Sequence, residues 1–186
     1  MTLGLIREDF VLRDLTLDDA PALFAWRCSP RIATTMLQPP PPSFEAHLGH
    51  LRRLLAERER HALYILEHRG RKVGHVALKP AAGDEGCGDW SIYVGEEDVP
   101  RGTGFALGVL ALERIFARPG FTMLRTRILA HNVASQRLHE RLAFDRETPS
   151  GGWINDDSGA WLLGSAKWRT NQCSLERVAF RAAEAD

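Results

Sequence analysis

The order in which helix-type and strand-type hydrophobic patterns follow one another most constrains the fold of this chain. Apolar residues at spacings of three and four predict amphipathic helices, and short β-type runs bounded by turn residues predict strands. The expected series is a strand at 10–12, helices from the Thr16 cap to about 27 and from the Ser43 cap to about 60, strands at 62–67, 72–79 and 89–94, a helix at 103–117, a strand at 123–130, a helix at 133–142, and strands at 144–146 and 160–168. A mixed sheet with helices on both faces buries such a series, so we expect an α/β domain.

Proline placement and chain length set the organisation. Pro30 and the run Pro39–Pro42 interrupt residues 28–42, which are expected to form a loop. A length of 186 residues matches one compact unit. We expect a single domain over residues 1–168 and a C-terminal tail over residues 169–186.

The charge balance excludes proteins that work by bulk charge. The chain has 24 Lys and Arg against 24 Asp and Glu, so nucleic acid and anionic membranes are not expected partners. The N-terminus lacks the apolar stretch of a signal peptide, and no run approaches the roughly 18 apolar residues of a membrane span. Three distant Cys residues and an isolated His47/His50 pair predict no metal site. We expect a cytoplasmic protein, either a monomer or a homodimer.

The turn between the strand at 89–94 and the helix after it can hold a phosphate group. The first N–H groups of that helix have no helical partners and lie at the positive end of its dipole. Gly102 and Gly104 allow close backbone approach, and Arg101 can add a charge-assisted contact. The turn is neither a Walker A loop nor a full GxGxxG motif, because Leu107 stands at the third glycine position. Alone, these glycines could equally form only a tight turn.

A second motif follows about 26 residues downstream of Gly104. Together, Arg101-x-x-Gly104-x-Ala106 and Asn132 followed by Leu138, Leu142 and Phe144 resemble the two acetyl-CoA-binding motifs of the GNAT superfamily of N-acetyltransferases. The resemblance extends over about residues 10–168, because the order of strands and helices also matches. It implies the GNAT acyl-CoA N-acyltransferase fold, a mixed central sheet with two splayed strands flanked by helices. It also implies acetyl-CoA as cosubstrate and no metal.

The resemblance assigns cofactor contacts to particular residues. The pantetheine arm would lie between the splayed strands, on backbone groups of Ile92, Tyr93 and Val94. Asn132 would contact the arm through its amide. The diphosphate would lie on the N–H groups of Arg101, Gly102, Thr103, Gly104, Phe105 and Ala106. An acceptor amine would then attack the acetyl group directly, with proximity supplying most of the rate enhancement.

His139 is the candidate catalytic residue. Many family members place a Tyr directly after the position of Leu138 to protonate the departing CoA thiolate, and His139 stands there in this chain. The alternative is that His139 only packs on a helix surface. The general base stays open among Glu85, Asp89 and a water chain.

The first two helices and the loop between them carry the candidate acceptor site, which consists of Trp26, Arg27, Met36 and His47. The Trp-Arg pair before Pro30, the Met that closes the loop and the Ser-x-Glu-x-His helix start at Ser43 resemble the sugar-nucleotide acetyltransferases of pseudaminic acid biosynthesis. That resemblance implies acetylation of the 4-amino group of UDP-4-amino-4,6-dideoxy-N-acetyl-β-L-altrosamine.

The roles of this acceptor site have structural alternatives. An indole offers an apolar face to a sugar or base, and an Arg offers a forked donor set to a diphosphate. Trp26 could equally belong to the core, and Arg27 could pair with Asp18 or Asp19.

Two other functions remain open from the sequence. One is acetylation of protein N-termini, as in ribosomal-protein alanine acetyltransferases, or of polyamines. Arg27 and Arg31, with no acid in the connecting loop, favour an anionic acceptor over a polyamine. The other is a non-catalytic CoA-binding module.

Overall fold

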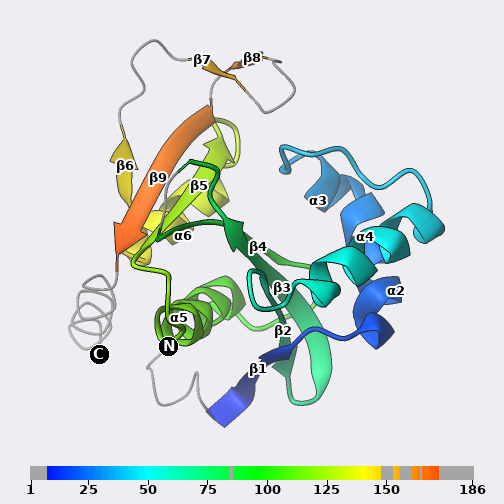
Figure 1. Ribbon diagram of the computed structural model, residues 1–186. Coiled ribbons are helices and arrows are strands. Elements are labelled where there is room, and N and C mark those ends of the chain that lie inside the picture. The colour runs from blue at the N-terminus through cyan, green and yellow to red at the C-terminus, as the bar shows by residue number, and fades with distance from the viewer. Residues whose placement is uncertain (1–7, 84–85, 148–152, 156–160, 164, 172–186) are drawn as a thin grey trace.

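A mixed sheet forms the centre of the computed structural model, which describes residues 8–83, 86–147, 153–155, 161–163 and 165–171. Among the described strands the order is β1-β2-β3-β4-β5-β9-β6, and of these neighbouring pairs only β4–β5 is parallel (Figure 1). The bounds are β1 Phe10–Asp14, β2 Ala62–His68, β3 Arg71–Pro80, β4 Cys87–Val94, β5 Met123–Leu129, β6 Asp145–Glu147 and β9 Ser165–Asn171. Two further strands, β7 (Trp153–Asn155) and β8 (Trp161–Leu163), pair with each other in a separate sheet.

Helices cover both faces of the sheet, which confirms the predicted α/β class (Figure 1). One face carries η1, α2, α3 and α4, and the other carries α5 and α6. Their bounds are η1 Leu17–Asp19, α2 Ala20–Cys28, α3 Pro30–Ala33, α4 Phe44–Ala56, α5 Thr103–Phe116 and α6 Val133–Arg141.

Each face has its own hydrophobic core because strand side chains alternate between the two faces. On β4, Trp90 belongs to the core beneath α5, whereas Tyr93 belongs to the core beneath α2 and α4. The sequence pattern therefore positions two different sets of side chains on either side of the same strand.

The expected loop at 28–42 contains a helix, so that prediction was wrong over part of its length. The Ser29 hydroxyl accepts a hydrogen bond from the Ile32 N–H, and Pro30 occupies the first helical position of α3. Proline suits that position, because its missing N–H would have no helical partner there and its φ is already helical. Pro30 thus starts a short helix instead of preventing one.

Several boundaries also differ from the predicted ones. The helix expected to reach residue 60 ends at Ala56, and the strand expected to start at 89 starts at Cys87. The segment 160–168 divides between β8 and β9, and β9 continues to Asn171, three residues past the expected domain boundary.

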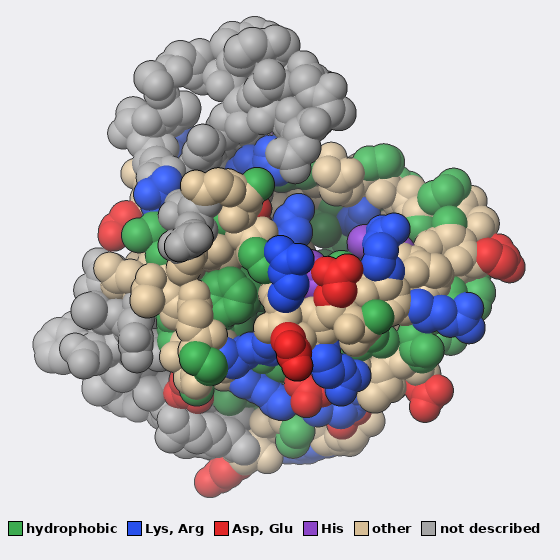
Figure 2. Space-filling model, in the orientation of Figure 1, with side chains coloured by type: hydrophobic (Ala, Val, Ile, Leu, Met, Phe, Trp, Pro, Cys, Tyr) green, Lys and Arg blue, Asp and Glu red, His purple; other side chains and the backbone are tan. Residues whose placement is uncertain are grey.

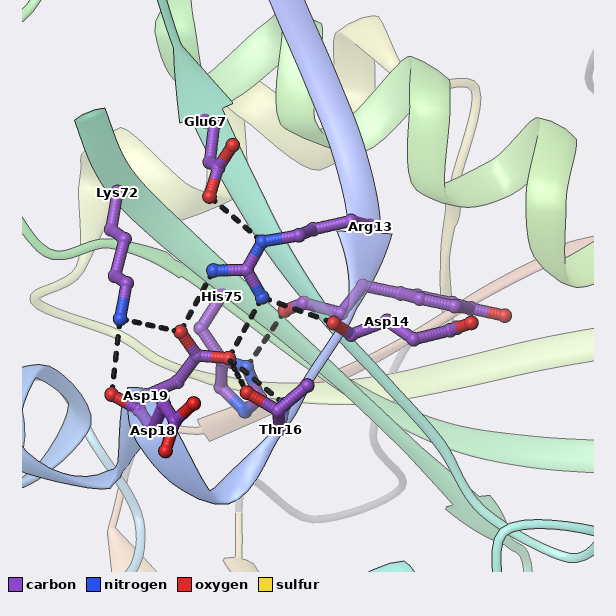
Figure 3. Close-up of polar contacts among 9 residues, drawn as sticks. Arg13, Asp14, Thr16, Asp18, Asp19, Glu67, Lys72 and His75 are labelled. Atoms are coloured by element: carbon purple, nitrogen blue, oxygen red, sulfur yellow. Dashed lines mark hydrogen bonds and ion pairs between the residues drawn. The ribbon is translucent and has the colours of Figure 1, made fainter. Parts of the chain in front are cut away.

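Asp19 attaches the α2 side of the molecule to the sheet (Figure 3). Its carboxylate is fully buried and accepts two hydrogen bonds of 2.8 Å from Arg13 on β1. Lys72 on β3 lies 2.7 Å away, and the Thr16 N–H donates at 2.9 Å. Burial alone would raise the pKa of Asp19, but the hydrogen bonds from Arg13, Lys72 and Thr16 outweigh it and hold that pKa well below its usual value.

Candidate functional site

Strands β4 and β5 run side by side for only three residue pairs and then separate. The pairs are Cys87 with Met123, Gly88 with Leu124, and Asp89 with Arg125. At the last pair the Asp89 Oδ1 lies 2.5 Å from the Arg125 Nε. Beyond it, β5 stays paired with β9, so a gap opens between β4 and β5. The splayed pair expected from the sequence is therefore present.

The edge of β4 that faces this gap carries backbone groups that β5 does not pair. The Gly95 N–H donates to the Val73 carbonyl of β3 at 2.8 Å. In an antiparallel ladder, the backbone groups of successive residues point alternately toward and away from the neighbouring strand. Because the Gly95 N–H points toward β3, the backbone groups of Ile92 and Val94 point away from β3 and into the gap. The backbone groups of Tyr93 point toward β3 instead. Of the three residues expected to hold an extended ligand arm, Ile92 and Val94 are therefore suitably oriented, and the backbone of Tyr93 is not.

The turn before α5 forms one wall of a cleft of about 460 Å³. Gly102 adopts a left-handed φ of 91°, which favours glycine. The Thr103 N–H donates to the Pro100 carbonyl, and the Ala106 N–H donates to the Gly102 carbonyl. Among the expected phosphate-binding groups, those two N–H groups are thus already used. The N–H groups of Gly104 and Phe105 precede the first helical bond and remain for an anion.

Arg31 on α3 also lines this cleft. Its Nη1 donates to the Val94 carbonyl at 3.1 Å, and its Nη2 donates to the Gly95 carbonyl. Its Nε lies 3.4 Å from the carboxylate of Glu97. The sequence identified Arg31 only as a basic residue near the acceptor loop, because its contacts with β4 join positions 63 and 64 residues apart.

His139 is buried, with 1% of its surface exposed. Its Nε2 accepts a hydrogen bond from the Trp90 indole N–H at 3.1 Å, and its Nδ1 lies 2.7 Å from the Ser135 carbonyl. An indole only donates and a carbonyl only accepts, so the proton of the neutral ring resides on Nδ1. Burial lowers the pKa of His139 to about 4. Both ring nitrogens therefore have hydrogen-bond partners within the protein. This arrangement differs from both expectations for His139, a proton donor to the CoA thiolate and a residue packed on the helix surface.

Asn132 caps α6, with its Oδ1 accepting from the Ser135 N–H at 3.1 Å. Only its NH₂ group remains to contact a ligand, so the capping bond fixes which end of the amide is available.

The expected acceptor residues lie on the α2–α4 side of the sheet. Trp26 is 6% exposed, packs edge-on against Tyr93 and donates from its indole to Glu96 at 2.7 Å, so it belongs to the core. Met36 is half-buried against the same core. Arg27 does not pair with Asp18 or Asp19. Its Nη2 donates instead to the carbonyls of Gln38 and Pro39 and so holds the proline-rich loop.

Two polar atoms on this side are buried without a hydrogen-bond partner in the structure. They are the Arg27 Nη1 and the His47 Nε2. Burial, the neighbouring His50 and Arg27 all lower the pKa of His47, which favours its neutral form. An unpaired buried polar atom costs about 1–3 kcal/mol, so both atoms favour a bound partner.

Further basic residues lie on the same side of the gap. The neighbours of Arg125 and Arg127 in β5, Leu124 and Ile128, pack beneath α5, so strand alternation places both arginines on the opposite, acceptor-facing side. The side chain of Arg127 makes no hydrogen bond or ion pair with any residue that the structure describes. Figure 2 shows a hollow in this face with Lys and Arg side chains on its rim and a His side chain beside it.

Within the described ranges there is no group of three or more His, Cys, Asp or Glu residues that could hold a metal ion. In the same part of the chain, no helix has both the length and the hydropathy to span a membrane. Glu85, one candidate base, lies outside the described residues, and the other, Asp89, is paired with Arg125.

Comparison with known proteins agrees with this geometry. The family model described as an acetyltransferase (GNAT) domain matches residues 9–145. No curated protein matched the chain. Solved structures with a similar fold include the aminoglycoside acetyltransferase AAC(6')-Ib in complex with coenzyme A, at 18% identity and a TM-score of 0.73, covering 90% of this chain and 98% of that one.

Two other similar structures have different acceptors in their names. A chimera of the spermidine N-acetyltransferase SpeG from Vibrio cholerae and hSSAT has 15% identity and a TM-score of 0.74, covering 90% of this chain and 98% of its own. The ribosomal L7/L12 α-N-protein acetyltransferase RimL, in complex with coenzyme A, has 13% identity and a TM-score of 0.72, covering 88% of this chain and 94% of its own.

Proposed function

Because the chain belongs to the GNAT acetyltransferase family, we propose that it transfers an acetyl group from acetyl-CoA to a primary amine on an anionic acceptor. The acceptor class that we favour is a UDP-amino-deoxysugar, with the 4-amino group as the nucleophile. The observation that carries this choice is the buried Nη1 donor of Arg27, which has no hydrogen-bond partner and lies on the acceptor side, as does the unpartnered Nε2 of His47.

The donor groups of the cleft fit acetyl-CoA. The N–H groups of Gly104 and Phe105, at the positive end of α5, suit a diphosphate, and Arg101 lies exposed at the same turn. The open edge of β4 at Ile92 and Val94 suits an extended arm with amide groups, which would add to the sheet as a strand does. The NH₂ group of Asn132 would serve the same arm.

Bound acetyl-CoA supplies an activated acetyl group: the amine nitrogen forms a bond to the carbonyl carbon, the C–S bond breaks, the amine loses a proton and the CoA sulfur leaves as a thiolate. The protein's contribution is to hold both reactants at the gap, which makes the transfer effectively unimolecular. His139 supports this arrangement by fixing the Trp90 side chain of β4 through its Nε2. A role for His139 as the acid would require that hydrogen bond to break.

The charge on the acceptor side favours an anion. Arg27 offers its unpartnered Nη1, and Arg127 adds a cation without a described partner. A polycation such as spermidine or an aminoglycoside would meet both of these charges, and like-charge juxtaposition disfavours binding. Phosphate oxygens would instead accept charge-assisted hydrogen bonds from them.

The test is a CoA-release assay with four acceptors: a UDP-4-amino-sugar, spermidine, kanamycin and an N-terminal peptide. We expect turnover with the UDP-amino sugar. Arg127→Gln should raise its KM about tenfold, because one charge-assisted contact is lost, while the KM for acetyl-CoA stays unchanged.

Arg118→Gln is the matched control, since Arg118 donates to the carbonyls of Arg58 and Glu59 and is not among the residues lining the cleft. Turnover with spermidine, kanamycin or the peptide but none with the UDP-amino sugar would show that the acceptor class is wrong. Absence of CoA release with every amine, despite CoA binding, would indicate a non-catalytic CoA-binding module.

A further inference from the structure

Arg31 is held by weak partners in this structure. Two of its contacts are to neutral backbone carbonyls, those of Val94 and Gly95. The third is to the carboxylate of Glu97, whose side chain is 81% exposed, while that of Arg31 is 40% exposed. Ion pairs with this much exposure contribute little, because solvent screens them. The guanidinium can therefore leave these partners at small cost.

The position of Arg31 conflicts with an arm bound along β4. Its Nη1 occupies the Val94 carbonyl, which lies on the edge of β4 that β5 leaves unpaired. An extended ligand that adds to this edge would use that carbonyl as an acceptor and would compete with Arg31 for it. The bound arm would thus favour a position of the Arg31 guanidinium away from this carbonyl.

The cleft offers one strong alternative partner for the displaced guanidinium. Arg31 and the Arg101–Gly104 turn line the same cleft. A diphosphate bound at that turn would be the largest negative charge in the cleft. A charge-assisted, forked contact with phosphate oxygens is stronger than the contacts to neutral carbonyls that it would replace.

We propose that Arg31 is a second cationic ligand of the cofactor's diphosphate, which it contacts after leaving the carbonyls of Val94 and Gly95. This inference rests on the proposed use of acetyl-CoA as the acyl donor. The diphosphate would then be contacted by Arg101 and the α5 N-terminus and also by Arg31, which lies on the acceptor side of the molecule.

This contact would connect the cofactor to the acceptor wall. Arg31 lies on α3, where Ile32 is buried in the core and the Thr34 carbonyl lies 2.9 Å from the His131 Nε2 beyond β5. The segment around α3 thus reaches both sides of the gap between β4 and β5.

The experiment separates the charge of Arg31 from its hydrogen bonds. Arg31→Gln keeps a neutral donor for the carbonyls, and Arg31→Lys keeps the charge. We would measure the Kd of CoA by calorimetry and kcat/KM with acetyl-CoA and with acetyl-pantetheine, which lacks the diphosphate. Arg71→Gln is the control, because Arg71 contacts Asp98 in the same loop and is not among the residues that line the cleft.

We expect Arg31→Gln to raise the Kd of CoA about tenfold, Arg31→Lys to restore most of that affinity, and Arg71→Gln to leave it unchanged. With acetyl-pantetheine, all three variants should match the wild type. Equal Kd values for the wild type and Arg31→Gln, or equal losses with both acyl donors, would overturn the inference. Failure of the wild type itself to bind CoA would instead refute the proposed function.

Discussion

Replacing Asp19 by Asn should destabilise the fold in a strongly pH-dependent way. Asn keeps the size of the side chain but removes the negative charge of the carboxylate. That carboxylate accepts two hydrogen bonds from Arg13 and lies 2.7 Å from the Lys72 Nζ. Breaking a fully buried ion pair costs about 3–5 kcal/mol. The side chains of Arg13 and Lys72 are 31% and 33% exposed and can regain water, so we expect a smaller loss of about 2–3 kcal/mol at neutral pH.

The sign of the pH dependence follows from the direction of the pKa shift. The pKa of Asp19 in the folded protein lies below its ordinary value of 3.8, so its contribution is fully present above that value. It is lost as the pH falls below 3.8 toward the folded pKa. At about pH 3 the unfolded chain is mostly protonated at this residue, and the difference between wild type and variant should shrink by about 1 kcal/mol.

Urea denaturation followed by circular dichroism at about pH 7 and pH 3 measures both quantities. Asp18→Asn is the control, because the Asp18 side chain is exposed and only its backbone carbonyl accepts from Lys72. That control should change the free energy of unfolding by less than about 0.5 kcal/mol. If Asp19→Asn destabilises no more than Asp18→Asn at neutral pH, or if its effect is the same at both pH values, the buried charge does not stabilise the fold as reasoned.

Three further changes test other parts of the structure. His139→Phe should change kcat less than about threefold and leave the pH dependence of kcat above pH 6 unaltered, because a pKa of about 4 keeps the His139 ring neutral there. A loss of kcat of about a hundredfold would instead support His139 as the acid. Gly95→Ala should lower the free energy of unfolding by about 2 kcal/mol in thermal or urea unfolding, since its Cβ would overlap the Trp26 indole, and a neutral result would show that the indole can move. Ala143→Gly should change the melting temperature little, because relief of the left-handed φ of 57°, worth about 1–2 kcal/mol, is offset by the backbone entropy of glycine and by the loss of a methyl group buried in the core. A loss of more than about 2 kcal/mol in thermal unfolding would contradict that balance.

Local patterns predicted the elements of the fold because each depends on neighbours in the sequence. The strand, the glycine turn and the helix around Gly102 follow from alternation, a left-handed residue and helical spacing, and all three are present. The prolines of residues 28–42 predict a loop, because proline interrupts a helix interior. Pro30 nevertheless starts α3, since Ser29 supplies the cap that allows a proline at the first helical position.

Contacts between distant residues set the site chemistry that the sequence could not predict. The hydrogen bond from Trp90 to His139 joins positions 49 residues apart. The burial that comes with this packing lowers the pKa of His139 and keeps the ring neutral. The contacts of Arg31 and Arg27 likewise depend on how α2 and α3 pack on the sheet.

The separation of β4 from β5 gives the protein an edge strand in the middle of its sheet. Free edges are where proteins add foreign strands and begin to aggregate. Here the exposed stretch is short, and an arginine from α3 covers part of it. Cofactor-free protein should therefore be the form most prone to self-association in concentrated solution, and adding CoA during purification should protect it by completing the sheet.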